Sequence, residues 1–110
     1  MVSFSERVLS YAMQIPRGRV STYQDIAHKL GCRAYQAVGS ALRSNKNPIV
    51  VPCYRVVHAN GFVGMYLGSS KQIKIKVALL QKEGVCFDEK NNVINFDKVR
   101  YTFGSNPNTN

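Results

Sequence analysis

Two short helices separated by a glycine constrain the fold of this chain more than any other feature of its sequence. The first is predicted from Thr22 to Gly31, because Thr22 and Asp25 form a helix start and Gly31 a helix end. Its buried face consists of Ile26, Ala27 and Leu30. The second is predicted over residues 34–44 and ends before the turn at 45–48. Two short helices around a glycine turn are typical of a helix-turn-helix.

The small residues along the second of these helices leave two interpretations open. Small side chains allow another helix to pack closely, and in a basic chain they also allow the backbone to approach a nucleic-acid groove. The residues in question are Ala34, Ala37, Gly39, Ser40 and Ala41. Their spacing alone favours neither interpretation.

The remaining elements predict a mainly α fold, a winged helix-turn-helix with a short β-hairpin wing. A capping box at Ser3 and Glu6 starts a helix that Pro16 ends. Residues 56–63 are predicted to form a hairpin turning at Asn60-Gly61, and a fourth helix begins at Ser69 or Ser70 and closes at Gly84. Residues 86–87 and 93–96 are predicted to pair around Asn91-Asn92. We expect one domain over residues 1–103 and a disordered tail over 104–110.

The charge of the chain favours a polyanionic partner. Its formal net charge is +9, and between Arg7 and Lys82 the only acidic residue is Asp25. The alternative is that the lysines only solvate a surface. Nucleic acid is the better interpretation of a distribution this one-sided.

Several classes of protein are disfavoured by what the sequence lacks. Neither a signal peptide nor an apolar run near the roughly 18 residues of a membrane span is found, so we expect an intracellular protein without membrane contact. The three cysteines form no CxxC pair, which disfavours both a disulfide framework and a zinc site. We expect no metal, no cofactor and a monomer, with Cys32 and Cys86 serving as packing residues.

Cys53 is the candidate chemical group. It follows the apolar run 49–51 and Pro52, so it lies at a junction between elements. A lone cysteine is more often a buried structural thiol than a nucleophile. His58 is placed on an extended strand facing solvent, which disfavours a cysteine-histidine dyad.

The sequence around Cys53 resembles the DNA-binding and active-site domain of the O6-alkylguanine-DNA alkyltransferases. Residues 36–45 (QAVGSALRSN) and 48–57 (PIVVPCYRVV) resemble that family's recognition helix and active-site strand. Further resemblance lies in 18–23 (GRVSTY), in the loop 61–68 and in 79–84 (LLQKEG), so that it covers about residues 4–85. We expect no counterpart of the family's N-terminal domain or of the zinc site found there in some members.

The resemblance implies a repair protein that enters the minor groove of double-stranded DNA and flips O6-alkylguanine out of the stack. The alkyl group would then pass irreversibly to Cys53, so that each molecule acts once. The implied catalytic residues are Cys53, Tyr54, Glu83 and Tyr23. The implied substrate-binding residues are Tyr66, Pro48, Val56, Val63, Leu67 and Asn45, of which Asn45 braces the active-site turn. The implied DNA contacts are Thr22, Tyr23, Gln36, Ala37, Gly39, Arg43 and Arg33.

Two positions depart from the family pattern. Tyr54 stands where the family has a histidine that relays the thiol proton toward the glutamate matched by Glu83. A phenol, with a pKa of about 10, is a poorer base than an imidazole at about 6.5, so we expect Tyr54 to act at most as a hydrogen-bonded bridge to Glu83 and transfer to be slower. Gln36 stands where the family has the arginine that fills the gap left by the flipped base, and Arg33 is a substitute for that role.

Two other functions compete with alkyl transfer. One is a non-catalytic relative that binds alkylated DNA and recruits other repair factors; the retained Cys53 disfavours it. The other is a winged-helix transcription regulator that reads sequence in the major groove, and it leaves Pro52-Cys53 unexplained.

Overall fold

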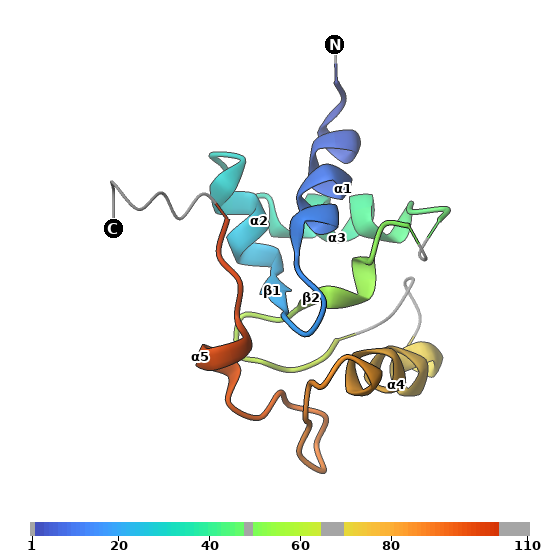
Figure 1. Ribbon diagram of the computed structural model, residues 1–110. Helices are drawn as coiled ribbons and strands as arrows, with labels where there is room; N and C mark the ends of the chain where they lie inside the picture. The colour runs from blue at the N-terminus through green and yellow to red at the C-terminus, as the bar shows by residue number, and fades with distance from the viewer. Residues whose placement is uncertain (1, 48–49, 65–69, 104–110) are drawn as a thin grey trace.

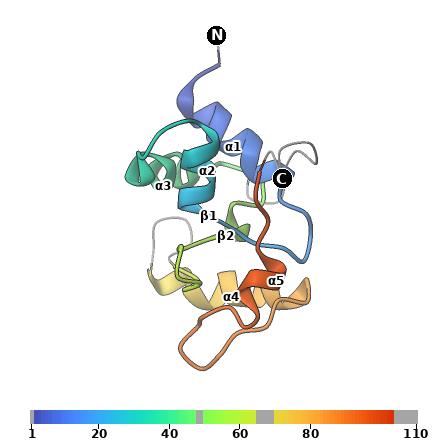
Figure 2. The ribbon, with the colours of Figure 1, turned by 90° about the vertical axis from the view of Figure 1, so that its left-hand side faces the viewer.

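The computed structural model describes residues 2–47, 50–64 and 70–103, which form two layers of helices on either side of a small sheet. Helices α1, α2 and α3 form one layer, α4 and the C-terminal segment form the other, and β1 and β2 lie between them (Figures 1 and 2). Each layer has its own hydrophobic core. The mainly helical class with a small sheet is confirmed.

Helix α1 spans Phe4–Gln14 and begins as its sequence predicts. The Ser3 hydroxyl accepts a hydrogen bond from the Glu6 N–H, and the Glu6 side chain accepts one from the Ser3 N–H. This is the predicted capping box, which satisfies two of the free N–H groups of the first turn. The helix buries Val8 and Ala12 and ends just before Pro16.

The helix-turn-helix consists of α2 (Tyr23–Lys29) and α3 (Tyr35–Arg43). Thr22 caps α2 by accepting a 3.0 Å hydrogen bond from the Asp25 N–H. Gly31 has a φ of +78°, a left-handed conformation that glycine adopts without strain, and it lets the chain turn out of α2. Both helices pack against each other and α1 packs across α3, so the predicted pair of helices is confirmed.

The sheet differs in its pairing from the expected hairpin. Strand β1 (Ser21–Thr22) pairs in parallel with β2 (Val56–Val57), which comes from a distant part of the chain. The turn at Asn60-Gly61 is present, closed by a 2.9 Å hydrogen bond from the His58 N–H to the Phe62 carbonyl. Phe62 then bridges to Asn92 and not back to β2. Successive strand residues point to opposite faces, so Val56 lies in one core and Val57 in the other.

The C-terminal half closes the second core. Cys53–Arg55 forms the short 3₁₀ helix η1, and a second 3₁₀ turn, η2 (Ser70–Gln72), leads into α4 (Ile73–Lys82). The predicted pairing within 86–94 is confirmed by the bridge between Phe87 and Val93. The expectation that residue 96 extends this pairing is wrong, because it starts a one-turn helix, α5 (Phe96–Val99).

The end of the described chain returns to β1. The Val20 N–H donates to the Val99 carbonyl at 2.9 Å, and the Val20 carbonyl accepts from the Tyr101 N–H at 2.6 Å. Arg100 forms an ion pair with Asp25 at 2.7 Å. The segment therefore fastens the second layer to α2. No helix of the described ranges has both the length and the apolar character needed to cross a membrane.

Candidate functional site

Cys53 lies at the first position of η1. Its side chain is 6% exposed and packs in the core formed by the first three helices. The Cys53 N–H donates a 2.8 Å hydrogen bond to the Val51 carbonyl, which forms a tight turn through Pro52. The predicted junction thus fixes the backbone that carries the sulfur.

Asn45, at the end of α3, holds this turn from the other side. Its Nδ2 donates to the Val51 carbonyl at 2.8 Å, and its Oδ1 accepts from the Asn47 N–H at 3.0 Å. The side chain is buried, so both hydrogen bonds are shielded from water. The amide therefore spans the turn before Cys53.

The surroundings of Cys53 act on the pKa of its thiol in opposite directions. Burial raises its pKa, because the anion loses solvation. A hydrogen bond from Asn45 and the positive charge of Lys76 lower it but do not reverse the shift. The free protein therefore holds Cys53 mainly as the neutral thiol.

Lys76, on α4, is a site residue that the sequence analysis missed. Its side chain is only 1% exposed, and burial lowers its pKa to about 7, which the negative charge of a Cys53 thiolate opposes. A signal was present in the spacing: Lys76 follows Ile73 by three residues and precedes the buried Leu80 by four, which places it on the apolar face of the helix.

Tyr54, Arg55 and Glu83 form a hydrogen-bonded cluster next to Cys53. The Tyr54 hydroxyl donates to Glu83 Oε2 at 2.5 Å, and Arg55 donates to both carboxylate oxygens at 2.9 and 2.7 Å. The Gly18 N–H donates to Oε1 at 3.1 Å. Arg55 also donates to the Ile15 carbonyl at 2.8 Å. The pair of Glu83 and Arg55 thus joins the ends of α1 and α4 to η1.

The pKa values in this cluster follow from its contacts. Burial and the Glu83 carboxylate raise the pKa of Tyr54. Burial alone would raise the pKa of Glu83, but the hydrogen bonds from Arg55, Tyr54 and Gly18 lower it. Glu83 is therefore ionised and Tyr54 protonated at neutral pH.

Tyr23, the first residue of α2, lines an open trough and lies close enough to Cys53 to interact with its charge. Burial, and secondarily the charge of a Cys53 thiolate, raises the pKa of Tyr23 to about 12. Its phenol is therefore a proton donor and not a base at neutral pH. Its ring contacts His58 at a centroid distance of 5.3 Å.

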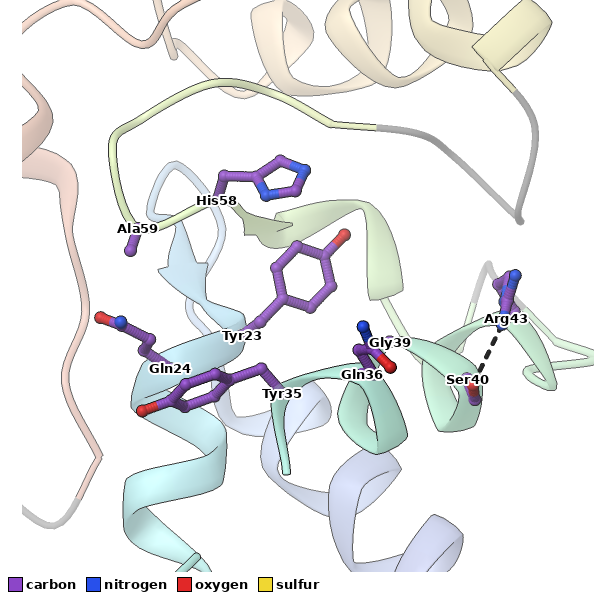
Figure 3. A pocket seen from close by; sticks show the side chains of 9 residues that line it. All are labelled: Tyr23, Gln24, Tyr35, Gln36, Gly39, Ser40, Arg43, His58 and Ala59. Atoms are coloured by element: carbon purple, nitrogen blue, oxygen red, sulfur yellow. Dashed lines mark hydrogen bonds between the residues drawn. The ribbon is translucent and has the colours of Figure 1, made fainter. Parts of the chain in front are cut away.

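The trough runs along one face of α3 and has a volume of about 540 Å³. Figure 3 shows its lining side chains, with His58 above Tyr23, Tyr35 below it, and Gln36, Ser40 and Arg43 to its right. They are Tyr23, Gln24, Tyr35, Gln36, Gly39, Ser40, Arg43, His58 and Ala59. The structure thus brings four of the predicted DNA-contacting residues together: Tyr23, Gln36, Gly39 and Arg43.

The other predicted DNA contacts lie elsewhere. Thr22 has no exposed surface, and its hydroxyl caps α2, so its side chain serves the helix start. Arg33 is exposed but borders a different hollow with His28, Gly31 and Cys32. Ala37 is exposed outside the lining of the trough.

The predicted substrate-binding residues divide in a similar way. Val56 and Val63 are fully buried in the described structure, on opposite sides of the sheet. Pro48, Tyr66 and Leu67 lie outside the described residues. The expectation for the two remaining cysteines is half right: Cys32 packs against the first core, whereas Cys86 is exposed and is not a packing residue.

Fold and site together define a class of protein, a basic helix-turn-helix domain that buries a cysteine in the core formed by its first three helices. The family model described as 6-O-methylguanine DNA methyltransferase, DNA binding domain, matches residues 3–85, and the chain belongs to this family.

Curated relatives carry one recurring name. A methylated-DNA–protein-cysteine methyltransferase of Candida glabrata is 38% identical over 96 residues, which cover 86% of this chain and 45% of the relative. One from Saccharolobus solfataricus is 43% identical over 86 residues, which cover 78% and 54%. The chain therefore spans about half the length of the curated relatives it matches.

Solved structures are similar in two different ways. The Mycobacterium tuberculosis OGT in complex with DNA has a TM-score of 0.66 and 38% identity, over 76% of this chain and 50% of that one. The S. pombe Atl1 in complex with damaged DNA containing O6-carboxymethylguanine has a TM-score of 0.76 and 25% identity, over 90% and 94%. The first structure has the higher sequence identity, and the second is matched over more of both chains.

Proposed function

We propose that this chain is a DNA repair protein that binds double-stranded DNA through the exposed face of α3, extrudes an O6-alkylguanine and accepts its alkyl group on Cys53. The observation that carries the proposal is the burial of Cys53 in the same core as the helix-turn-helix, on a turn braced by Asn45. The curated relatives with 38–43% identity support it by their name. We infer that the protein acts in a compartment that contains DNA.

The proposed reaction is a displacement at the alkyl carbon. The sulfur of the Cys53 thiolate attacks this carbon, the bond from carbon to guanine O6 breaks, and its electron pair passes to the guanine. The proton that the thiol loses is balanced by one that the guanine takes up, and the neutral guanine remains part of the DNA strand. Because the thioether is stable, each molecule reacts once.

Formation of the thiolate is the demanding step in this site. Tyr54 is a poor proton acceptor, since its own proton is donated to Glu83. The groups that favour the anion are the Asn45 amide and the Lys76 ammonium. We infer that these two groups, and not a histidine relay, activate the sulfur in this chain.

The mass of the protein tests the proposal directly. The full chain is incubated with a duplex that carries one O6-methylguanine, and peptide mapping locates any methyl group. We expect one methyl group on Cys53 and none on Cys32 or Cys86. The matched controls are Cys53→Ser, which should stay unmodified, and Cys32→Ala, which should react as the natural chain does. An unmodified Cys53 after complete binding of the DNA would rule out the transferase.

The second candidate function is a non-catalytic protein that binds alkylated DNA and recruits other repair factors. The observation in its favour is the similarity to Atl1 over nearly the whole of both chains. The retained Cys53 is the observation against it. Tight binding to the lesion duplex without any gain in mass would favour this second function.

A further inference from the structure

Much of the positive charge of this chain lies away from the face that the proposed function uses. The formal net charge is +9, yet Arg43 is the only cation among the described residues that line the trough along α3. Other cations are used inside the fold, Arg55 and Arg100 in ion pairs and Lys76 through burial. Contact with DNA at α3 therefore does not account for the exposed lysines elsewhere.

A row of exposed residues, three of them lysines, follows the outer side of α4. Positions three or four residues apart lie on the same side of a helix. One such row begins in η2, and we name it the α4 stripe; it consists of Lys71, Lys74, Ile75, Ala78 and Lys82, all of them exposed. The buried residues Lys76 and Leu80 lie on the opposite side of the helix, where Leu80 packs in one core with Val57 of β2.

Arg17 extends the α4 stripe at its C-terminal end. Its guanidinium donates a 3.2 Å hydrogen bond to the Lys82 carbonyl, which holds this exposed charge at the end of the helix. From Lys71 to Lys82 a helix rises about 16 Å. The positive side chains are thus spread along one continuous strip of the surface.

No acidic side chain of the same segment offsets these charges. Residues 70–82 contain no aspartate or glutamate, and Glu83, which follows them, is 3% exposed and paired with Arg55. A solvated helix face is typically laced with opposite charges three or four residues apart, which stabilise the helix, whereas like charges at this spacing destabilise it. The α4 stripe therefore weakens the helix unless an external anion neutralises it.

The α4 stripe fits the phosphate backbone of duplex DNA. Each strand of B-DNA carries a phosphate about every 3.4 Å along the axis, so a strip about 16 Å long spans about five of them. Lysine ammonium groups on flexible stems suit phosphates, whose contacts carry no sequence information. Ile75 and Ala78, between the lysines, have no side-chain hydrogen-bonding group with which to read a base edge.

The α4 stripe also points away from the helix-turn-helix. Figures 1 and 2 show α4 in one layer and α1, α2 and α3 in the other, with the small sheet between them. Because Leu80 faces the sheet, the opposite side of α4 faces away from the sheet and from the α3 layer. DNA bound along α3 thus leaves the α4 stripe open to another segment of DNA.

We propose that the α4 stripe binds the phosphate backbone of a second segment of duplex DNA, so that one molecule joins two segments. The proposal rests on the proposed function only in that the first segment binds at α3. A protein with two such surfaces passes from one segment to the next without leaving the DNA. This transfer shortens the search for a rare lesion.

Capture of a second duplex tests the proposal. A short undamaged duplex is immobilised on beads, the full chain is bound to it, and a labelled duplex of the same length is added. The test variant is the double substitution Lys74→Gln, Lys82→Gln. The matched control is Lys90→Gln, Lys98→Gln, which removes the same charge from exposed positions of the same layer outside the α4 stripe.

We expect the natural chain to capture the labelled duplex and the test variant to capture it about tenfold less well at about 0.1 M salt, because two phosphate contacts are lost. The slope of log capture against log salt should fall by about two for the same reason. The control should capture like the natural chain. In solution, the affinities of the two double variants for a single duplex should agree within about twofold.

Three results would overturn the proposal. Equal loss of capture in both double variants would show a general effect of net charge. A test variant that binds a single duplex as weakly as it captures a second one would place the α4 stripe on the first duplex. A natural chain that binds the immobilised duplex without capturing the labelled one would show that no second surface exists.

Stoichiometry and the choice of DNA separate this proposal from its alternatives. Sedimentation velocity with excess duplex should show one chain joined to two duplexes. Bridged complexes that always contain two chains would assign the bridging to association between proteins and would also overturn the proposal. Because the duplexes are undamaged, the α4 stripe is tested even if no methyl group ever reaches Cys53.

Discussion

The Tyr54 hydroxyl donates a 2.5 Å hydrogen bond to the Glu83 carboxylate. The same carboxylate receives two hydrogen bonds from Arg55 and one from the Gly18 backbone, so all of its accepting capacity is used within the protein. A phenol bound in this way holds its proton more firmly than a free one. We interpret the cluster as a clamp that positions η1, next to Cys53, and not as a path for the thiol proton.

Restoring an imidazole at this position tests that interpretation. Tyr54→His places a base with a pKa near neutrality beside Cys53, within reach of Glu83. We expect the single-turnover rate of methyl transfer at pH 7.5 to rise about tenfold or more, toward the range typical of general-base catalysis. Tyr54→Phe is the matched control; it provides no base and should give no acceleration. A slower Tyr54→His would show that the phenol itself contributes to transfer.

Breaking the clamp should cost more stability than breaking the other ion pair of the described structure. The side chains of Glu83 and Arg55 are 3% and 14% exposed, so Glu83→Gln leaves a buried guanidinium without its counter-ion. We expect urea unfolding to show a loss of about 3 kcal/mol. Asp25→Asn is the comparison, because Arg100 is 33% exposed in that pair, and the loss should be about 1 kcal/mol. Equal losses would contradict this ranking.

Acid should destabilise the protein through the same two carboxylates. Hydrogen bonds from arginine lower the folded-state pKa of Glu83 and of Asp25, in each case against the effect of burial. A carboxylate with a lowered pKa stabilises the fold above its unfolded pKa and loses that contribution as the pH falls through its folded pKa. The free energy of unfolding should therefore fall below about pH 4.5, where the unfolded Glu83 begins to bind protons. The double variant Glu83→Gln, Asp25→Asn should show a much weaker dependence over this range.

Local signals in the sequence predicted much of the fold. The capping box at Ser3 and the N-cap at Thr22 depend on residues three positions apart, and both are confirmed. The pairing of β1 with β2 was missed because it joins Ser21 to Val56, and such non-local pairing leaves no trace in a period or a cap. The one-turn helix α5 was missed because a single turn has too few residues to show a period.

The candidate site was predictable only where a residue's surroundings are close in sequence. Asn45 and Cys53 are only eight residues apart in the sequence, and both belong to the stretch 36–57 that carries the resemblance. Lys76 comes from the other layer of the fold. Because it follows Lys74 by two residues, it suggests a solvated lysine, and only its spacing from Ile73 and Leu80 along the helix places it on the apolar face. The trough is assembled from α2, α3 and the turn after β2, so Tyr35 and His58 gave no local sign of sharing it.

Asn45 offers a direct test of the brace on the active-site turn. Asn45→Ala removes two buried hydrogen bonds, to the Val51 carbonyl and from the Asn47 N–H, and leaves both groups without that partner. We expect a loss of about 2 kcal/mol in the free energy of unfolding. The transfer rate should fall about tenfold, since the sulfur loses both its position and a hydrogen bond. Ser44→Ala, which removes one hydrogen bond at the end of the same helix, is the control and should leave the rate within about twofold.

Burial of Lys76 should lower the stability of the fold, while its charge should raise the reactivity of Cys53. Its folded-state pKa of about 7 lies below the ordinary value of 10.5, so between these values the unfolded chain binds a proton that the folded chain does not. Stability attributable to Lys76 should therefore rise as the pH is raised from about 7 to 8.5, and Lys76→Met should lack this rise. Lys74→Met, on the exposed side of the same helix, should retain it.

The reactivity of Cys53 should change in the opposite sense. Without the Lys76 charge the thiolate is less favourable, and one pKa unit on the sulfur corresponds to about a tenfold lower population of the anion. We expect Lys76→Met to slow single-turnover methyl transfer about tenfold at pH 7, with Lys74→Met within about twofold of the natural chain. The difference in rate between Lys76→Met and the natural chain should shrink as the pH rises. Lys76 loses its own proton above about pH 7, so the natural chain then also lacks this positive charge. Equal slowing in both variants would mean that the lost charge had acted on the DNA and not on the sulfur.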